Sequence, residues 1–248
     1  MIFNSKSSPR QQASRRQFLR TVALFFGIMA TSLATFFPVI AKWVPARLRP
    51  PGAIEEEDYL ASCIKCGQCV QVCPVEAIRL ADMDEGMGIG VPYIEARDQA
   101  CDFSCDALQC ILACPTGSLS HNLTKKEEVR MGLARVVRPE ACLARLCLGF
   151  KGQARGPLFP GLLRYEEVDR WKPILVRDHP YDVELCDLCV RECPIENAIS
   201  LQAIDNAGKC KLPVIHEACV GCGVCEMICP VEPTVIVIDE RKTWEDRA

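Results

Sequence analysis

The sequence has few of the groups from which enzymes build a catalytic centre. It contains three histidines, His121, His179 and His216, and their separation does not match the spacing of metal ligands, so we expect surface or packing roles. No nucleophile motif, phosphate-binding loop or flavin fingerprint occurs in the chain. One segment alone is long and apolar enough to cross a bilayer, which excludes a polytopic membrane protein.

The charge balance excludes a further class of function. The net charge is −3, but residues 1–41 carry five basic side chains and no acidic one. The rest of the chain therefore holds 24 of the 29 basic side chains and all 32 acidic ones, a net charge of −8. Nucleic acids are bound by basic faces that release counterions from phosphates, so a nucleic acid is not the expected partner. An acidic surface suits a basic protein patch, or serves solubility alone.

Residues 1–41 have the features of an export signal. Residues 14–20 read Ser-Arg-Arg-Gln-Phe-Leu-Arg and precede an uncharged run over residues 21–41. Paired arginines before an apolar stretch are typical of twin-arginine signals, which carry folded proteins and so suit cofactors inserted before export. The predicted compartment is the periplasm. Ala41 permits cleavage, but about 20 uncharged residues would also span a bilayer as an N-terminal anchor, and the sequence leaves both outcomes open.

Composition also predicts where the folded domain lies. Residues 42–53 are rich in proline and basic residues and are predicted to form a linker. The folded domain is predicted over residues 54–240 and is followed by a tail over residues 241–248. Within the domain, residues 148–183 are too rich in Gly and Pro for regular structure. We expect a surface insertion there, which either contacts a partner or is neutral.

Cysteine, in contrast, is abundant, with 18 of 248 residues, and this density requires a chemical reason. The first cassette is Cys63, Cys66, Cys69 and Cys73, and the fourth cassette is Cys219, Cys222, Cys225 and Cys229. Both have gaps of two, two and three residues and end in Cys-Pro, which is the spacing of bacterial ferredoxins. In such a run three cysteines bind one cluster, and the last binds the other cluster of a pair.

Other uses of closely spaced cysteines fit less well. Zinc sites place two Cys-x-x-Cys pairs a dozen or more residues apart. Disulfides are possible in an exported protein, but repeated two-residue spacing gives poor disulfide geometry. Covalent haem requires a histidine directly after a Cys-x-x-Cys pair, and the sequence has none. Iron–sulfur clusters are therefore the predicted reason for the cysteines.

Two more cassettes have looser spacing. The second cassette is Cys101, Cys105, Cys110 and Cys114, and the third contains Cys186, Cys189 and Cys193. Each lies in a similar frame, in which a β-type run leads into the cassette and Cys-Pro is followed by a brief helix and another β-type run. The Glu-Ala lead before Cys142 matches the lead before Cys219, so Cys142 is the preferred missing ligand, although Cys147 could replace it. Cys147 and Cys210 are otherwise expected to be bystander thiols.

The four cassettes predict four [4Fe–4S] clusters, or about 16 iron atoms per chain. The predicted ligands are Cys63, Cys66, Cys69, Cys73, Cys101, Cys105, Cys110, Cys114, Cys142, Cys186, Cys189, Cys193, Cys219, Cys222, Cys225 and Cys229. Metal binding at this density would contribute stability that a modest apolar core lacks. The predicted fold class is α+β, with tandem bacterial two-[4Fe–4S] ferredoxin-like modules.

These features are similar to those of the NapG/MauM family of periplasmic ferredoxin-type iron–sulfur proteins. The resemblance covers nearly the whole chain and includes residues 47–53, 66–71, 92–98 and 131–134. It implies four [4Fe–4S] clusters and electron transfer from a polytopic, quinol-oxidising NapH-like membrane protein toward a periplasmic reductase, with nitrate reductase as the expected acceptor. The MauM branch implies methylamine oxidation instead.

The resemblance leaves several points open. Similar iron–sulfur subunits imply that the first and fourth cassettes share a module, whereas the sequence equally allows the first with the second and the third with the fourth. Three residues separate Cys101 from Cys105 where the family has two, and the insertion separates Cys142 from Cys186, which indicates a divergent subgroup. With every thiolate assigned, no iron has an open position, so we expect a non-catalytic subunit of a quinol dehydrogenase complex. An iron–sulfur maturation or interaction factor is the alternative from another class.

Overall fold

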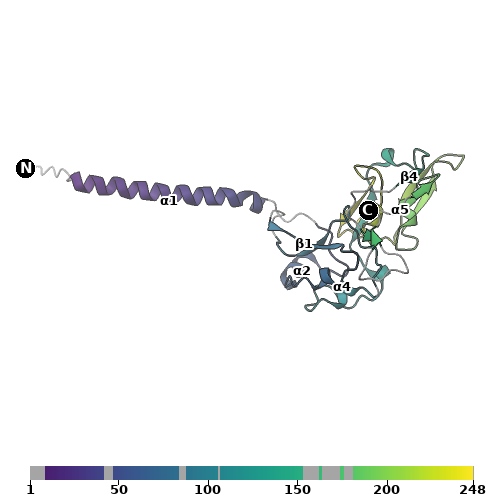
Figure 1. The fold of residues 1–248 in the computed structure, drawn as a ribbon, viewed down its shortest axis with the longest axis horizontal. Coiled ribbons are helices and arrows are strands. Elements are labelled where there is room, and N and C mark those ends of the chain that lie inside the picture. The colour runs from purple at the N-terminus through teal and green to yellow at the C-terminus, as the bar shows by residue number, and fades with distance from the viewer. Residues whose placement is uncertain are drawn as a thin grey trace, which may run out of the picture. The chain divides into compact units, whose positions relative to one another are not determined.

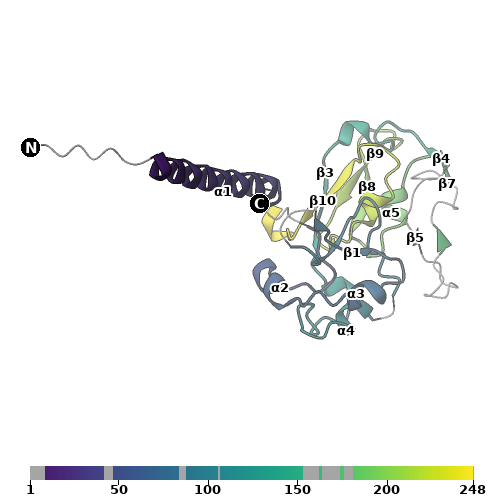
Figure 2. The same ribbon diagram turned by 60° about the vertical axis from the view of Figure 1, so that its left-hand side comes forward.

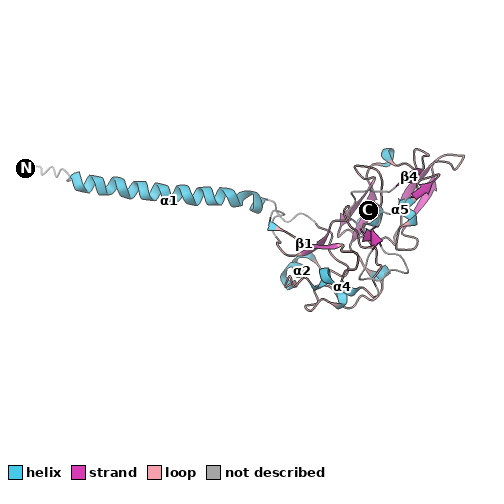
Figure 3. Ribbon diagram, in the orientation of Figure 1, coloured by secondary structure: helices cyan, strands magenta, loops and turns pink. Residues whose placement is uncertain are grey.

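The computed structural model describes residues 9–41, 47–83, 88–105, 107–152, 162–163, 174–175 and 181–247. The chain divides into two compact units, one of residues 1–45 and 82–89 and the other of residues 46–81 and 90–248. The first unit contains the long helix α1, and the second contains short helices and short paired strands (Figure 3).

Helix α1 spans Pro9–Ala41 and carries the predicted export signal (Figure 1). Proline is favoured at the start of a helix because its missing N–H has no partner there in any case. The side chains of Arg15 and Arg16 are exposed, and Phe25 in the apolar run is 64% exposed. In the part of the chain that is described, no helix combines the length and the continuous hydropathy needed to cross a membrane.

The second unit is an α+β arrangement of short elements, which Figure 2 shows from a second direction. Its helices are α2 (Glu56–Ser62), α3 (Gln68–Gln71), α4 (Gln109–Leu112), α5 (Leu188–Arg191) and α6 (Val224–Met227), with 3-10 turns η2 (Lys126–Glu128), η3 (Pro139–Ala141) and η5 (Glu245–Arg247). Its strands are β1 (Ile78–Leu80), β2 (Pro92–Ile94), β3 (Gly132–Val136), β4 (Phe150–Gly152), β5 (Leu162–Leu163), β6 (Ile174–Leu175), β7 (Tyr181–Val183), β8 (Ile199–Ala203), β9 (Lys211–Ile215) and β10 (Ile236–Glu240).

The described strands form antiparallel pairs. β1 pairs with β2, β3 with β10, β4 with β7, β5 with β6, and β8 with β9. The pairing of β3 with β10 sets Ala134 opposite Ile238 and so joins the middle of the chain to its end. In β10 the buried side chains, Ile236 and Ile238, are two positions apart, because alternate residues of a strand point to the same face.

One-turn helices occur inside the cysteine cassettes. The cysteine before the last one in each cassette lies on such a helix: Cys69 on α3, Cys110 on α4, Cys189 on α5 and Cys225 on α6. The helix therefore precedes the final Cys-Pro, and the prediction of a brief helix after Cys-Pro was wrong. The residue before a proline is pushed out of the α region, so the helical turn ends there and the chain continues into a turn and a strand.

The predicted insertion, residues 148–183, contains strands. β4 and β7 pair with Lys151 opposite Asp182, and β5 pairs with β6 between them in the sequence. The prediction that this segment is too rich in Gly and Pro for regular structure was therefore wrong at these positions. The aromatic and β-branched residues Phe150, Tyr181 and Val183 favour extended backbone and outweigh the neighbouring glycines. Most of the insertion lies outside the described residues.

The folded unit also extends beyond the predicted boundaries. Leu48 and Arg49 are 4% and 2% exposed, and the N–H of Ile94 donates to the carbonyl of Leu48 at 2.8 Å. The predicted linker therefore packs into the unit from residue 47 onward, because a Pro-rich segment is extended and leaves its carbonyls free to pair with β2. At the other end, the N–H of Arg241 donates to the carbonyl of Met131 at 3.0 Å, so the predicted tail is anchored as well.

Candidate iron–sulfur sites

The first candidate site combines cysteines of two cassettes. Cys63, Cys66 and Cys69 line a cavity together with Cys114, the last cysteine of the second cassette. Cys66 is exposed whereas Cys69 and Cys114 are buried, so this site reaches the surface on one side. Burial, with added repulsion from Cys63, raises the pKa of the Cys69 thiol to about 11. Thiols this reluctant to ionise become ligands when a bound metal displaces their protons.

The second candidate site contains the remaining cysteines of the first two cassettes. These are Cys73, Cys101, Cys105 and Cys110. Burial is the main cause that raises the pKa of Cys101, and the thiols of Cys110 and Cys73 add repulsion. Burial also raises the pKa of Cys73, to which Cys105 adds. Burial, with added repulsion from Cys105 and Cys73, also raises the pKa of Cys110, so each of the four thiols has another member of the set close by.

The third and fourth candidate sites repeat this arrangement. The third cavity is lined by Cys142, Cys186, Cys189 and Cys229, and the fourth by Cys193, Cys219, Cys222 and Cys225. Cys229 of the fourth cassette thus joins the third site, and Cys193 of the third cassette joins the fourth site. The cavities of the first, third and fourth sites are small, with volumes of about 20, 30 and 20 Å³.

The structure pairs the first cassette with the second and the third with the fourth. The expectation that the first and fourth cassettes share a module was therefore wrong. In each cassette the third cysteine lies on the one-turn helix and the last cysteine follows the helix, and their sulfurs belong to different sites. Because α3 packs against α4 and α5 against α6, the cassette within reach of each last cysteine is its neighbour in the sequence.

The donor sets fit a four-iron cluster. Each site gathers four cysteine sulfurs, which are the usual ligands of [4Fe–4S] clusters. Among the residues that the structure describes, no three His, Cys, Asp or Glu side chains lie close enough together to bind one ion. At three sites the four sulfurs instead line one small cavity, and a cubane requires such spacing because each thiolate binds a different iron.

Cys147 and Cys210 form a disulfide with Cα atoms 4.4 Å apart. The prediction that they are bystander thiols was wrong, and Cys147 no longer competes with Cys142, which lines the third cavity. A tight turn after Cys142, closed by the hydrogen bond from Leu146 N–H to the Cys142 carbonyl at 3.0 Å, separates the two cysteines. The N–H of Lys211, next to Cys210, donates to Ala144 in the same turn at 3.0 Å, which brings the β9 strand to Cys147.

Sequence reasoning missed polar residues that surround the first site. Tyr59 lines its cavity, is 1% exposed, and donates its hydroxyl to the Pro92 carbonyl at 3.2 Å. The Ser118 hydroxyl lies 3.2 Å from the Cys114 sulfur. Burial alone would raise the pKa of Cys114, but hydrogen bonds from Ser118 and from neighbouring backbone N–H groups outweigh it and lower the pKa to about 7. Single tyrosines and serines carry no spacing signal, so only the fold reveals them.

Two of the three histidines make hydrogen bonds near the sites. His121 Nε2 lies 3.0 Å from the Cys114 carbonyl oxygen, and His216 Nε2 lies 2.7 Å from the Ser200 hydroxyl. These contacts fit the packing roles expected from the sequence. His179 lies outside the described residues.

Cysteine sites of this kind define the ferredoxin-type iron–sulfur proteins. A family model described as "4Fe-4S dicluster domain" matches residues 62–118 and 184–232, which contain the first two and the last two cassettes. The chain is 36% identical over 239 residues to the ferredoxin-type protein NapG of Escherichia coli (strain K12), covering 93% of this chain and 87% of the relative. It is 33% identical over 242 residues to the NapG of Haemophilus influenzae, covering 93% and 73%.

A second group of relatives has another name. The methylamine utilization ferredoxin-type protein MauM of Methylorubrum extorquens is 31% identical over 235 residues, with 92% of this chain and 90% of the relative covered. No solved structure matches the chain. The chain therefore belongs to the NapG/MauM family, and it is a ferredoxin-type iron–sulfur electron-transfer protein that binds [4Fe–4S] clusters.

Proposed function

We propose that the chain holds four [4Fe–4S] clusters in two tandem two-cluster modules, with the four cysteines of each candidate site as ligands. The observation that carries this proposal is the exchange of last cysteines, in which Cys73 and Cys114 change places between the first two sites and Cys193 and Cys229 between the last two. In two-cluster ferredoxins, too, the last cysteine of each cassette binds the other cluster of the pair.

A bound [4Fe–4S] cluster gains or releases one electron, at a potential set by charge, hydrogen bonding and exposure. The chain's own residues provide that environment. Thiolates hold the iron, and Ser118 donates a hydrogen bond toward Cys114. Apolar groups shield the buried sites, as Leu188 does beside the third cavity at 0% exposure.

The proposed donor is a polytopic NapH-like membrane protein that oxidises quinol, and the proposed acceptor is a periplasmic reductase, with nitrate reductase as the first candidate. The similarity to NapG over nearly the whole chain supports this assignment. The paired arginines on α1 support export to the periplasm in a folded state. The chain then serves as a non-catalytic subunit of a quinol dehydrogenase complex.

A second candidate function is electron transfer in methylamine oxidation. Several relatives at 31–33% identity bear the name methylamine utilization ferredoxin-type protein MauM. This identity is close to the 33–36% of the NapG relatives. The two candidates differ in the partner and share the same cluster chemistry.

Anaerobic affinity purification from native membranes, with identification of partners by mass spectrometry, separates the two candidates. Recovery of a polytopic membrane protein and a molybdenum reductase supports the quinol-to-nitrate role, whereas methylamine dehydrogenase subunits support the second. Iron analysis of the same sample should give about 16 atoms per chain. Clusters that no quinol can reduce, recovered with a reductase precursor alone, would instead identify a maturation factor.

A further inference from the structure

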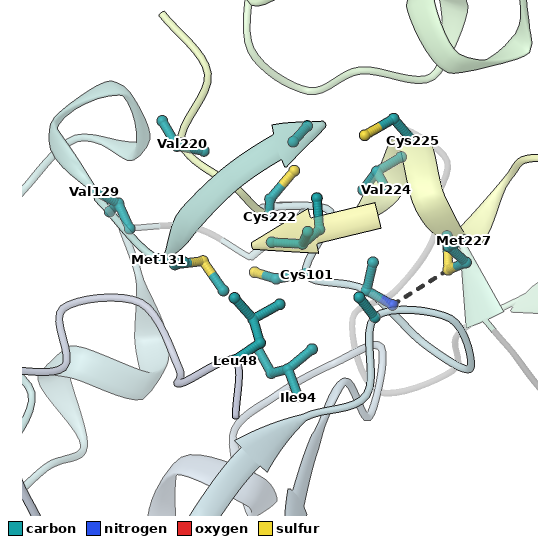
Figure 4. Close-up of a cluster of buried hydrophobic side chains, with 14 of the residues drawn as sticks. Leu48, Ile94, Cys101, Val129, Met131, Val220, Cys222, Val224, Cys225 and Met227 are labelled. Atoms are coloured by element: carbon teal, nitrogen blue, oxygen red, sulfur yellow. Dashed lines mark hydrogen bonds between the residues drawn. The ribbon is translucent and has the colours of Figure 1, made fainter. Parts of the chain in front are cut away.

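The first module, formed by the first two cassettes, contacts the second module, formed by the last two, through candidate cluster ligands. The backbone N–H of Cys101, in the second site, donates to the carbonyl of Cys222, in the fourth site, at 3.3 Å. Cys101 and Cys222 are 8% and 7% exposed, so this contact is sheltered from water. Figure 4 shows the two cysteines close to each other and to Met131, within a cluster of apolar side chains.

The fourth cassette packs directly on the turn that precedes Cys101. Gly223 has φ +91°, and a Cβ atom at this position would lie 2.6 Å from the Cβ of Ala96, so a larger residue would force the two segments apart. Beside it, the N–H of Ala100 donates to the sulfur of Met227 at 3.3 Å, the dashed line in Figure 4. Small residues on both sides therefore keep the junction short.

Arg97 closes the same junction from its edge. Its guanidinium donates to the backbone carbonyls of Glu226 at 2.6 Å, Cys229 at 2.9 Å and Val231 at 3.1 Å, and to the carboxylate of Glu232 at 2.6 Å. Glu226 lies on α6, and Cys229 and Val231 lie at the Cys-Pro bend that follows it. The Arg97 side chain is 17% exposed, so these bonds are partly shielded from water. One residue of the first module thus binds the loop that positions Cys229.

We propose that the second and fourth sites are neighbours across the boundary between the two modules. The four sites then lie in the order first, second, fourth, third. Arg97 is a positioning residue that holds the two modules together at this junction. This inference rests on the proposed function. An electron that crosses between the modules would leave a cluster at one of these two sites, which is oxidised, and enter a cluster at the other, which is reduced, and no bond forms or breaks. The first and third sites are then the two ends.

The order can be tested by removing one site at a time and measuring the magnetic interactions among reduced clusters by pulsed EPR. Cys142→Ala removes a ligand of the third site, and Cys219→Ala removes a ligand of the fourth. We expect the Cys142→Ala protein to keep the interaction between the first module and the fourth cluster. In the Cys219→Ala protein only the more distant third cluster remains in the second module, so we expect a much weaker interaction with the first module. The reverse pattern would overturn the proposed order.

The role of Arg97 has its own test. Arg97→Met should retain about 16 iron atoms per chain but weaken the interaction between the second and fourth clusters, and Arg97→Lys should restore part of it. Arg135→Met is the matched control, because Arg135 pairs with Asp239 at 2.7 Å and is 55% exposed. An unchanged second–fourth interaction in iron-replete Arg97→Met would refute the positioning role. Fewer than about 16 iron atoms in the unaltered protein would instead refute the four-cluster proposal.

Discussion

Removing the Cys147–Cys210 disulfide should leave the iron content unchanged and lower the stability. The two residues are 63 positions apart, and the chain-entropy relation gives about 4 kcal/mol at 25 °C for closing a loop of this length. In the loaded protein, the cluster bound by Cys142 and Cys186 would already join the same two segments. The loop closed by the disulfide then shrinks to about 30 residues, and the expected stabilisation falls to about 3.5 kcal/mol.

The perturbation is the double variant Cys147→Ser/Cys210→Ser, because either single variant would leave a reactive thiol near the third site. Iron and acid-labile sulfide are measured on the anaerobically purified protein, and denaturant unfolding gives the change in stability. Cys142→Ser is the matched control and should lose about four iron atoms. If the double variant loses iron, the assignment of Cys147 and Cys210 to a disulfide rather than to a cluster is refuted. Alkylation of both thiols in the unreduced wild-type protein would refute the cross-link itself.

Glu56→Ala should lower the free energy of unfolding by about 3 kcal/mol, because Arg49, at 2% exposure, would lose the carboxylate that its Nε meets at 3.2 Å. Burial alone would raise the pKa of Glu56, but Arg49 and Arg241 outweigh it and hold the pKa below the ordinary 4.5. The ionised carboxylate of Glu56 therefore contributes fully to the free energy of unfolding above pH 4.5, and this contribution falls as the pH drops through the lowered pKa. In the Glu56→Gln protein, this part of the loss of stability at acid pH should be absent. Gly221→Ala should lower the unfolding midpoint and the iron content, because Gly221 has φ +71° and an added Cβ would overlap the backbone of Gly132.

Controls for these substitutions come from the same chain. Gly117 also has φ +71°, but an added Cβ would meet nothing within 4 Å. Gly117→Ala should therefore cost about 1–2 kcal/mol from backbone strain alone, without loss of iron. Equal effects of the two alanine variants would contradict the packing argument. For Glu56, Glu55→Ala changes an exposed carboxylate one position away and should leave the unfolding midpoint nearly unchanged.

Local chemistry determined much of this protein from the sequence. Gaps of two residues let a short loop carry several thiolates to one cluster, so Cys63, Cys66 and Cys69 could be grouped without knowledge of the fold. The same spacing shows that a last cysteine such as Cys73 belongs to a different cluster from its cassette. The uncharged run to Ala41 likewise marks a segment separate from the cysteine-rich body.

Long-range packing decided the remaining features, because no local pattern encodes it. Which cassette receives Cys73 depends on the packing of α3 against α4, and the junction of Cys101 with Cys222 depends on the fit of Gly223 against Ala96. The sequence leaves Cys147 and Cys210 as two unassigned thiols, whereas in the structure the turn after Cys142 brings them together as a disulfide. Contacts between residues far apart in the chain form only when the fold brings them together, so tertiary structure alone reveals the contact of Cys101 with Cys222 and the disulfide.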